Sequence, residues 1–271
     1  MNRDDANLPK DCDFGGARRA RISSQCFKRA IRTDPIFATT TEVPNGTRTK
    51  YLAEKQLLPK LKSVLKPDSE AQALAWAFAE EYGMGIDDKG KTSVLLYLSD
   101  NETRAVAEAI AANRDALSTA IRQRAEAEKI EDKKKRDKAL KEVRKPWADL
   151  IEGIRKATKE RASAPDIALF GRMLADKPET NVDAACQVAH AISTHAVKMD
   201  IDYFTAVDDL LPNEETGAGM IGTTGFNSAC FYRYLRLDYG KLLENLKDDG
   251  DLARKTVQGL MLAAEAAIPT G

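Results

Sequence analysis

The spacing of apolar and polar residues near the start of the chain predicts one strand followed by one helix. Residues 2–17 have no regular spacing, and their polar side chains, proline and glycine pair predict a loop. Alternation over residues 19–22 predicts a short strand. A helix that is capped by Ser23 or Ser24 then extends to about Arg32.

The middle of the chain has a helical pattern. Residues 34–49 are rich in threonine, contain two prolines and predict a connection without regular structure. Residues 51–65 and 69–82 have helical spacing, and residues 102–142 are rich in the helix formers Ala, Glu, Lys and Arg. We therefore expect a large helical region whose core is mostly Ala and Leu.

The pattern changes again in the last third of the chain. Residues 180–195 predict a buried helix of small side chains, whereas residues 195–207 alternate like a strand and residues 220–237 resume strand character. Residues 238–246 and 251–268 predict helices. The chain is thus expected to be α+β. Because a mixed fold normally needs more strands than this, we expect that one or both ends are truncated.

Charge changes this picture locally. The chain has 42 basic and 42 acidic residues, yet the stretch from Arg18 to Arg32 holds six Lys or Arg residues and no acid. On the predicted helix the polar side chains share one face and the apolar ones the other, with Gln25, Lys28, Arg29 and Arg32 opposite Phe27, Ala30 and Ile31. A solvated helix face is the ordinary interpretation of such a run. The absence of an acid favours contact with phosphate instead.

Other chemistry-bearing residues have simpler interpretations. Four separated cysteines and two histidines make a poor metal set, and no apolar run is long enough to span a membrane, which predicts a cytoplasmic protein. His190 is expected to be a core histidine of the predicted helix, and His195 to lie at its end. Residues 129–145 mix acids with lysines at i, i+4 spacing, which predicts a solvated helix, with DNA contact as the alternative.

Several motifs together resemble a known family, and they are NRDD, FGGARRARISSQ, KRAIR, AHAISTH, DYFTAVDD and IGTTGFNSACFYRY. The chain resembles the CasC family, the repeated backbone subunit of the type I-E CRISPR surveillance complex called Cascade. The resemblance covers nearly the whole chain and is weakest in the helical region. It implies an RNA-recognition-motif-like (ferredoxin-like) palm at residues 1–47 and 181–271. A helical fingers domain is inserted at residues 48–180, and a long β-hairpin thumb spans about residues 196–226.

The resemblance also implies a function. Copies of the subunit would stack along a CRISPR guide RNA, contact target DNA through that guide, and assemble with large, small, capping and guide-processing endoribonuclease subunits. We expect no catalytic activity and no cofactor. The implied contacts to RNA phosphate or ribose are Arg3, Lys10, Ser23, Gln25, Lys28 and Arg32, with Arg19 and Arg21 supporting or joining them. The glycines Gly15 and Gly16 would let the backbone approach RNA, and Met173, Phe204 and Thr205 would pack around a displaced nucleotide.

Two alternatives remain open at this point. Backbone subunits of type III systems cut target RNA with an early loop aspartate, and this chain has four acids in its first loop, namely Asp4, Asp5, Asp11 and Asp13. The first alternative is therefore a metal-dependent ribonuclease. The second is a generic RNA-binding protein that acts as a monomer.

Overall fold

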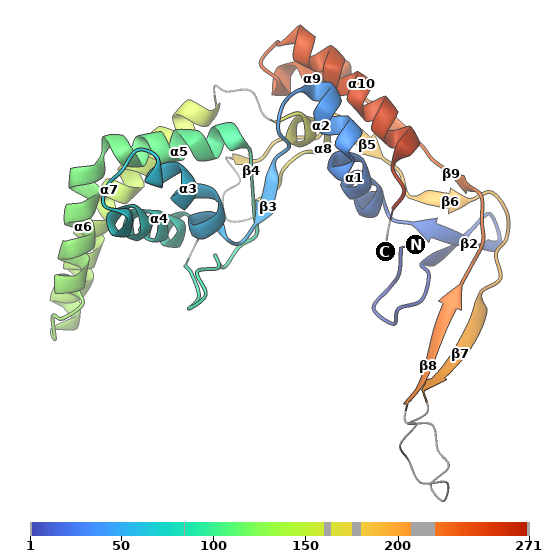
Figure 1. Cartoon of the computed structure of the whole chain (residues 1–271), viewed down its shortest axis with the longest axis horizontal. Helices are drawn as coiled ribbons and strands as arrows, with labels where there is room; N and C mark the ends of the chain where they lie inside the picture. The colour runs from blue at the N-terminus through green and yellow to red at the C-terminus, as the bar shows by residue number, and fades with distance from the viewer. Residues whose placement is uncertain (1, 84, 160–163, 175–179, 207–219, 270–271) are drawn as a thin grey trace, which may run out of the picture. The chain divides into compact units, whose positions relative to one another are not determined.

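The structure is a computed structural model that describes residues 2–83, 85–159, 164–174, 180–206 and 220–269 (Figure 1). Helices and small antiparallel sheets make it an α+β protein, as expected. The chain forms two compact units. Unit 1 comprises Met1–Thr40, Cys186–Asp238 and Lys255–Gly271, and unit 2 comprises Thr41–Ala185 and Tyr239–Arg254. The finer description as palm, fingers and thumb stays a prediction.

Unit 1 contains an antiparallel sheet whose described strands follow the order β1–β2–β6–β9. Its members are β1 (Asp11–Phe14), β2 (Ala17–Ile22), β6 (Ala191–Ser193) and β9 (Phe231–Tyr232). A glycine pair joins β1 to β2, and both glycines have positive φ, 63° at Gly15 and 73° at Gly16. Two consecutive residues of this kind form the tight turn that suits a two-residue hairpin. The expectation of a loop over residues 2–17 is therefore wrong for residues 11–14, and a strand does precede residue 18.

Helix α1 (Ser24–Thr33) confirms the predicted helix and its cap. Ser23 has an extended backbone, and its side chain accepts a hydrogen bond from the backbone N–H of Cys26 at 3.4 Å. Phe27 and Ile31 lie one turn apart on the buried side of the helix. The supposed connection over residues 34–49 is more ordered than expected, because it contains α2 (Pro35–Thr41) and β3 (Thr47–Thr49).

The helix expected over residues 180–195 is absent, and the described part of this segment forms two strands instead. The first is β5 (Cys186–Val188), which pairs with β10 (Leu235–Leu237). The second is β6, which pairs with β2. Small alanine and serine side chains give no clear period, so strand pairing decides the conformation. His190 lies in the exposed link between β5 and β6, not in a core helix, and His195 follows β6 rather than ending a helix.

The other elements of the last third agree with the sequence pattern. Strands β7 (Asp200–Ala206) and β8 (Met220–Phe226) form an antiparallel ribbon, within the segment expected to make the thumb hairpin. The middle of that segment, residues 207–219, lies outside the described residues. Helices α9 (Tyr239–Asn245) and α10 (Gly250–Ala266) confirm the last two predicted helices.

Unit 2 is built mainly from helices packed around leucine and alanine side chains. A π-helical turn at Leu52–Leu57 leads into α3, and the other elements follow in the order α3 (Leu58–Lys62), α4 (Asp68–Tyr82), β4 (Leu96–Leu98), α5 (Asp100–Ala112), α6 (Arg114–Ala127), α7 (Lys133–Lys159) and α8 (Pro165–Phe170). The stretch expected to be helical over residues 102–142 is divided among three helices. Of the two tryptophans, Trp147 is buried in this core and Trp76 is half-buried.

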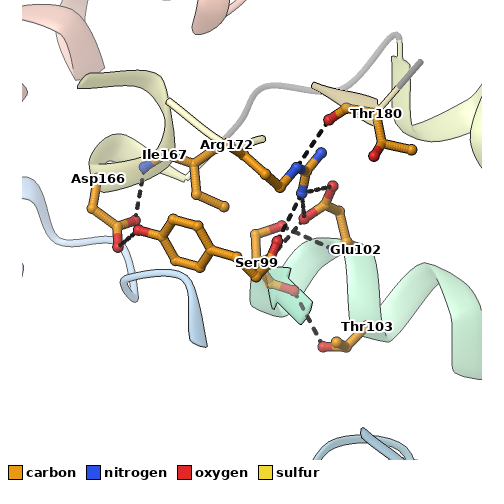
Figure 2. A network of polar contacts seen from close by, with 8 residues as sticks. Ser99, Glu102, Thr103, Asp166, Ile167, Arg172 and Thr180 are labelled. Atoms are coloured by element: carbon orange, nitrogen blue, oxygen red, sulfur yellow. Dashed lines mark hydrogen bonds and ion pairs between the residues drawn. The ribbon is translucent and has the colours of Figure 1, made fainter. Parts of the chain in front are cut away.

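A network of buried polar groups holds the segment after α8 against the rest of unit 2 (Figure 2). The Arg172 guanidinium donates from Nη1 to both carboxylate oxygens of Glu102, at 2.8 and 3.0 Å. Glu102 also accepts from the backbone N–H of Ser99, whose hydroxyl accepts in turn from the backbone N–H of Glu102, so the same carboxylate caps α5. The Arg172–Glu102 pair therefore ties the segment after α8 to the start of α5.

We predict that Arg172→Ala lowers the free energy of unfolding of unit 2 by about 3 kcal/mol, because it leaves a largely buried carboxylate without its partner. Arg104→Ala is the matched control, because Arg104 pairs with Asp100 at the surface and its removal should cost less than about 1 kcal/mol. Urea unfolding followed by tryptophan fluorescence reports on unit 2, which contains both tryptophans. Equal effects of the two substitutions would contradict the prediction.

Candidate nucleic-acid interface

Helix α1 presents a polar face with uncompensated positive charge. Gln25 and Arg29 are exposed and Lys28 is half-exposed, while Phe27 and Ile31 anchor the opposite side. Among the described residues, no carboxylate forms an ion pair with Lys28 or Arg29. Cations without acidic partners attract anions, so this face is the strongest candidate for binding phosphate.

The first residue of the basic stretch is not part of that uncompensated charge. Register pairing in the β1–β2 hairpin places Asp13 opposite Arg18, and Arg18 forms an ion pair with Asp11 at 2.7 Å. The hydrogen bond and the charge of Asp11 raise the pKa of Arg18 above its ordinary value. The inference that this stretch has no acid to pair with is therefore wrong at Arg18, because the acids come from the preceding strand.

The other two arginines of β2 bind groups of their own fold. Arg19 donates from Nε to the carbonyl of Phe14 and from Nη1 to the carbonyl of Ser193, both at 3.0 Å. Arg21 donates from Nε to the carbonyl of Asp11 at 3.3 Å, and its Nη1 lies 3.4 Å from Nδ1 of His190. These contacts fit the supporting role that the resemblance allowed for Arg19 and Arg21.

Ser23 connects the start of α1 to the first loop. Its backbone N–H donates to Oδ1 of Asn2 at 3.0 Å, and its side chain is nearly buried while it caps the helix. His190 contributes at the same place, since its Nδ1 accepts from the backbone N–H of Ser24 at 3.3 Å. Ser23 thus fixes the position of the α1 face, and the direct contact expected between Ser23 and RNA stays a prediction.

The first loop in turn connects α1 to the base of the β7–β8 ribbon. Arg3 donates from Nη1 to the carbonyls of Asn7, at 2.6 Å, and of Gly225, at 3.0 Å. Its guanidinium also lies 5.7 Å from the centre of the Phe226 ring. Lys10 is half-exposed, and its backbone N–H donates to the carbonyl of Asn2 at 3.0 Å. Arg3 and Lys10 therefore lie in one loop that contacts β8, the Ser23 cap of α1 and, through the carbonyl of Lys10, the backbone N–H of Arg21 on β2.

The glycine turn of the hairpin leaves room for a ligand. Gly15 and Gly16 are exposed, and an added Cβ at Gly16 would meet no heavy atom within 4 Å. Close approach of another backbone is therefore sterically possible at this turn. Positive φ at both positions explains why glycine is used there whether or not a ligand approaches.

The three residues expected around a displaced nucleotide are exposed in their own units. Phe204 and Thr205 lie on β7 in unit 1, where Phe204 is 44% exposed. Met173 lies in unit 2, directly after Arg172, and is 84% exposed. Arg172 is held in place by Glu102, so the fold presents the neighbouring Met173 side chain to solvent and does not bury it in a core.

Sequence reasoning missed several residues that shape this region. Asn2, Asp11 and Glu102 position other candidates, and Gly222 faces Phe204 across the ribbon. The glycines of the hairpin turn gave a usable signal for the acids beside Arg18, because a two-residue turn places Asp13 opposite Arg18 and Asp11 at the diagonal position on the same face. No comparable sequence signal identifies the partners of Arg172 or Asn2.

The acids of the first loop are partly occupied. Asp4 accepts from the backbone N–H of Leu8 at 2.8 Å, and Asp11 pairs with Arg18. Within the described part of the chain, no three His, Cys, Asp or Glu side chains gather as metal ligands. None of the helices described there has the length and apolar character needed to cross a membrane.

Comparison with known proteins places this geometry in context. Comparison with curated protein sequences gives no match. One similar solved chain, from a structure titled "CRISPR RNA-guided surveillance complex, pre-nicking", is 30% identical with a TM-score of 0.71; the match covers 100% of this chain and 69% of that chain. A second, from a structure titled "CRISPR RNA-guided surveillance complex", is 25% identical with a TM-score of 0.64; the match covers 99% of this chain and 68% of that one.

These neighbours confirm the resemblance that the sequence motifs indicated. A family model described as "CT1975-like protein" matches residues 1–271, which is the entire chain. The chain therefore belongs to the family of CT1975-like proteins.

Proposed function

We propose that this protein is a non-catalytic subunit of a CRISPR RNA-guided surveillance complex that binds the guide RNA and multimerises along it. The similar solved chains come from complexes of that description, which supports the complex as its setting. Its proposed partners are the guide RNA, target DNA paired to that guide, neighbouring copies of the same chain and the other subunits of the complex.

The observation that carries the proposal is the polar face of α1. Lys28 and Arg29 project from a helix whose opposite side is buried, and neither has an acidic partner among the described residues. RNA carries one phosphate per nucleotide, and each phosphate that a cation neutralises releases counterions into solution. Through such a face, a protein of zero net charge can bind a polyanion locally without covering its length.

A guide-binding subunit must accept every guide sequence, and contacts to the backbone meet this requirement. Phosphate and ribose contacts position a nucleic acid without reading its bases, while base pairing with the target supplies specificity. The candidates in unit 1 suit backbone contact, because they are cations, one amide side chain, one hydroxyl side chain and the glycine turn. They are Arg3, Lys10, Gly15, Gly16, Arg19, Arg21, Ser23, Gln25, Lys28 and Arg32.

Exposed apolar side chains account for the remaining candidates. A nucleotide displaced from the stack loses contact with its neighbours and is stabilised when it packs against an aromatic or apolar group, by about 1–3 kcal/mol per base. Phe204, Thr205 and Met173 are exposed and suit this role. None of them has another evident function at the surface.

Ribonuclease activity is the less favoured alternative. Asp4 and Asp11 are bound to a backbone N–H and to Arg18, and each would have to give up that contact to bind a metal ion. Asp5 and Asp13 are exposed and have no third ligand nearby among the described residues. This arrangement favours carboxylates that organise the first loop.

We predict that Lys28→Glu combined with Arg29→Glu weakens binding of single-stranded RNA at least about 100-fold, because two charge-assisted contacts are each worth about 1.5–3 kcal/mol. Fluorescence anisotropy with a labelled RNA measures the loss. Lys134→Glu with Lys138→Glu is the matched control, since it makes the same change of charge on the exposed part of another helix. Equal losses in the two variants would show that only overall charge matters.

We predict that the number of bound copies rises in proportion to RNA length. Analytical ultracentrifugation of the protein with RNAs of increasing length measures this stoichiometry. A constant single copy on long RNAs would refute multimerisation and favour the monomeric RNA-binding alternative.

We predict that guide and target RNAs remain intact when they are incubated with the protein and Mg²⁺ or Mn²⁺. Denaturing gel electrophoresis of end-labelled RNA checks this. Cleavage that Asp11→Asn or Asp4→Asn removes would establish the ribonuclease alternative instead.

A further inference from the structure

Gly222 occupies the interior of strand β8, directly opposite Phe204 of β7. Glycine weakens a strand because it adds backbone freedom and has no side chain to pack, so its presence there calls for a steric reason. Unlike the turn glycines Gly15 and Gly16, Gly222 does not have positive φ. Its backbone conformation is therefore open to any residue.

The steric reason is the ring of Phe204. A Cβ added at Gly222 would lie 2.7 Å from Cε2 and 2.9 Å from Cε1 of that ring, closer than real side chains approach. The ring thus extends across the partner strand and occupies the space that any other residue at position 222 would fill. Its edge contacts the bare backbone of β8.

This contact fixes how Phe204 is presented. The ring is held on the ribbon and still keeps 44% of its surface exposed. Tyr203 is the neighbour on β7 and pairs with Thr223, and it is 71% exposed. An aromatic ring that is already oriented loses less conformational freedom on binding than a mobile one.

We propose that Gly222 is a positioning residue that holds the Phe204 ring across the β7–β8 ribbon, in the orientation that receives an unstacked nucleobase. The inference rests on the proposed function, because it assumes that the chain binds RNA. It adds the geometric requirement that position 222 carry no side chain. Every base has an aromatic face, so a ring presented in this way accepts any base and preserves sequence-independent binding.

A purely structural role makes a different prediction. Cross-strand pairs of an aromatic residue with glycine also stabilise sheets, and Gly222 would then matter for the ribbon alone. In that case Gly222→Ala would lower thermal stability, and the fluorescence rise at the RNA positions that Phe204 affects would be unchanged while the variant is folded. If Gly222 acts through the ring, its effect must disappear once the ring is removed.

The test is a double-mutant cycle on the full chain with Gly222→Ala, Phe204→Ala and the two combined, and with Thr223→Ala as the control on the same strand. The probes are single-stranded RNAs with 2-aminopurine placed at successive positions, since this base fluoresces more strongly when it leaves the stack. Affinity and fluorescence are both recorded, with melting temperatures as the check on folding.

We expect Gly222→Ala and Phe204→Ala each to weaken RNA binding about tenfold and to reduce the fluorescence rise at the same RNA positions. The combined variant should lose no more than Phe204→Ala alone, and Thr223→Ala should behave like the unmodified protein. If Gly222→Ala fails to fold, the combined variant removes the overlap between the new Cβ and the ring. A combined variant that folds again and binds RNA as tightly as Phe204→Ala then supports the proposal.

Three results would overturn the inference. These are unchanged binding and fluorescence in Gly222→Ala, a further loss in the combined variant beyond Phe204→Ala, and a Phe204→Ala variant that behaves like the unmodified protein. In each case RNA binding by the protein persists and still depends on Lys28 and Arg29. Loss of that dependence would instead count against the proposed function.

Discussion

The pairing of β2 with its two neighbours is the constraint on which the candidate interface depends. Strand β2 lies between β1 and β6 and leads directly into α1 through the Ser23 cap. The position of β2 therefore sets the direction of α1 and with it the direction in which Lys28 points. The hydrogen bond from Ser23 to Asn2 attaches the first loop to the same point, and Arg3 attaches that loop to the base of β8. These two side chain–backbone hydrogen bonds thus link the start of α1, the first loop and the base of the β7–β8 ribbon.

Local pairing of charges decides which cations remain available to a ligand. Arg18 is compensated by Asp11, and Arg19 and Arg21 bind carbonyl groups. Within this basic stretch, Lys28 and Arg29 of α1 form no ion pair with a described residue, and the helix itself carries no acid. Burial of Cys186 on β5 raises the pKa of its thiol to about 11, against a smaller opposing effect of the Lys28 charge. The thiol of Cys186 therefore remains neutral and adds no negative charge that would offset Lys28.

Elements with strong local signals could be predicted from the sequence, and those decided by distant pairing could not. Helix α1 was predicted with its cap because Ser23 and the alternation of Phe27 and Ile31 with polar residues are local features. Strands β5 and β6 were mistaken for a helix because their partners β10, β2 and β9 lie far away in the sequence. The ion pair between Arg172 and Glu102 and the contact between Gly222 and Phe204 likewise depend on register and packing.

The central claim is that the protein binds the backbone of RNA and ignores its bases. The most direct test measures the dissociation constant for several RNAs of equal length and unrelated sequence over a range of salt concentrations. The account predicts values that agree within about threefold at each salt concentration, with the logarithm of the affinity falling linearly with the logarithm of salt by about 0.7 per phosphate contacted. Affinities that differ by orders of magnitude between sequences, or that do not change with salt, would contradict it.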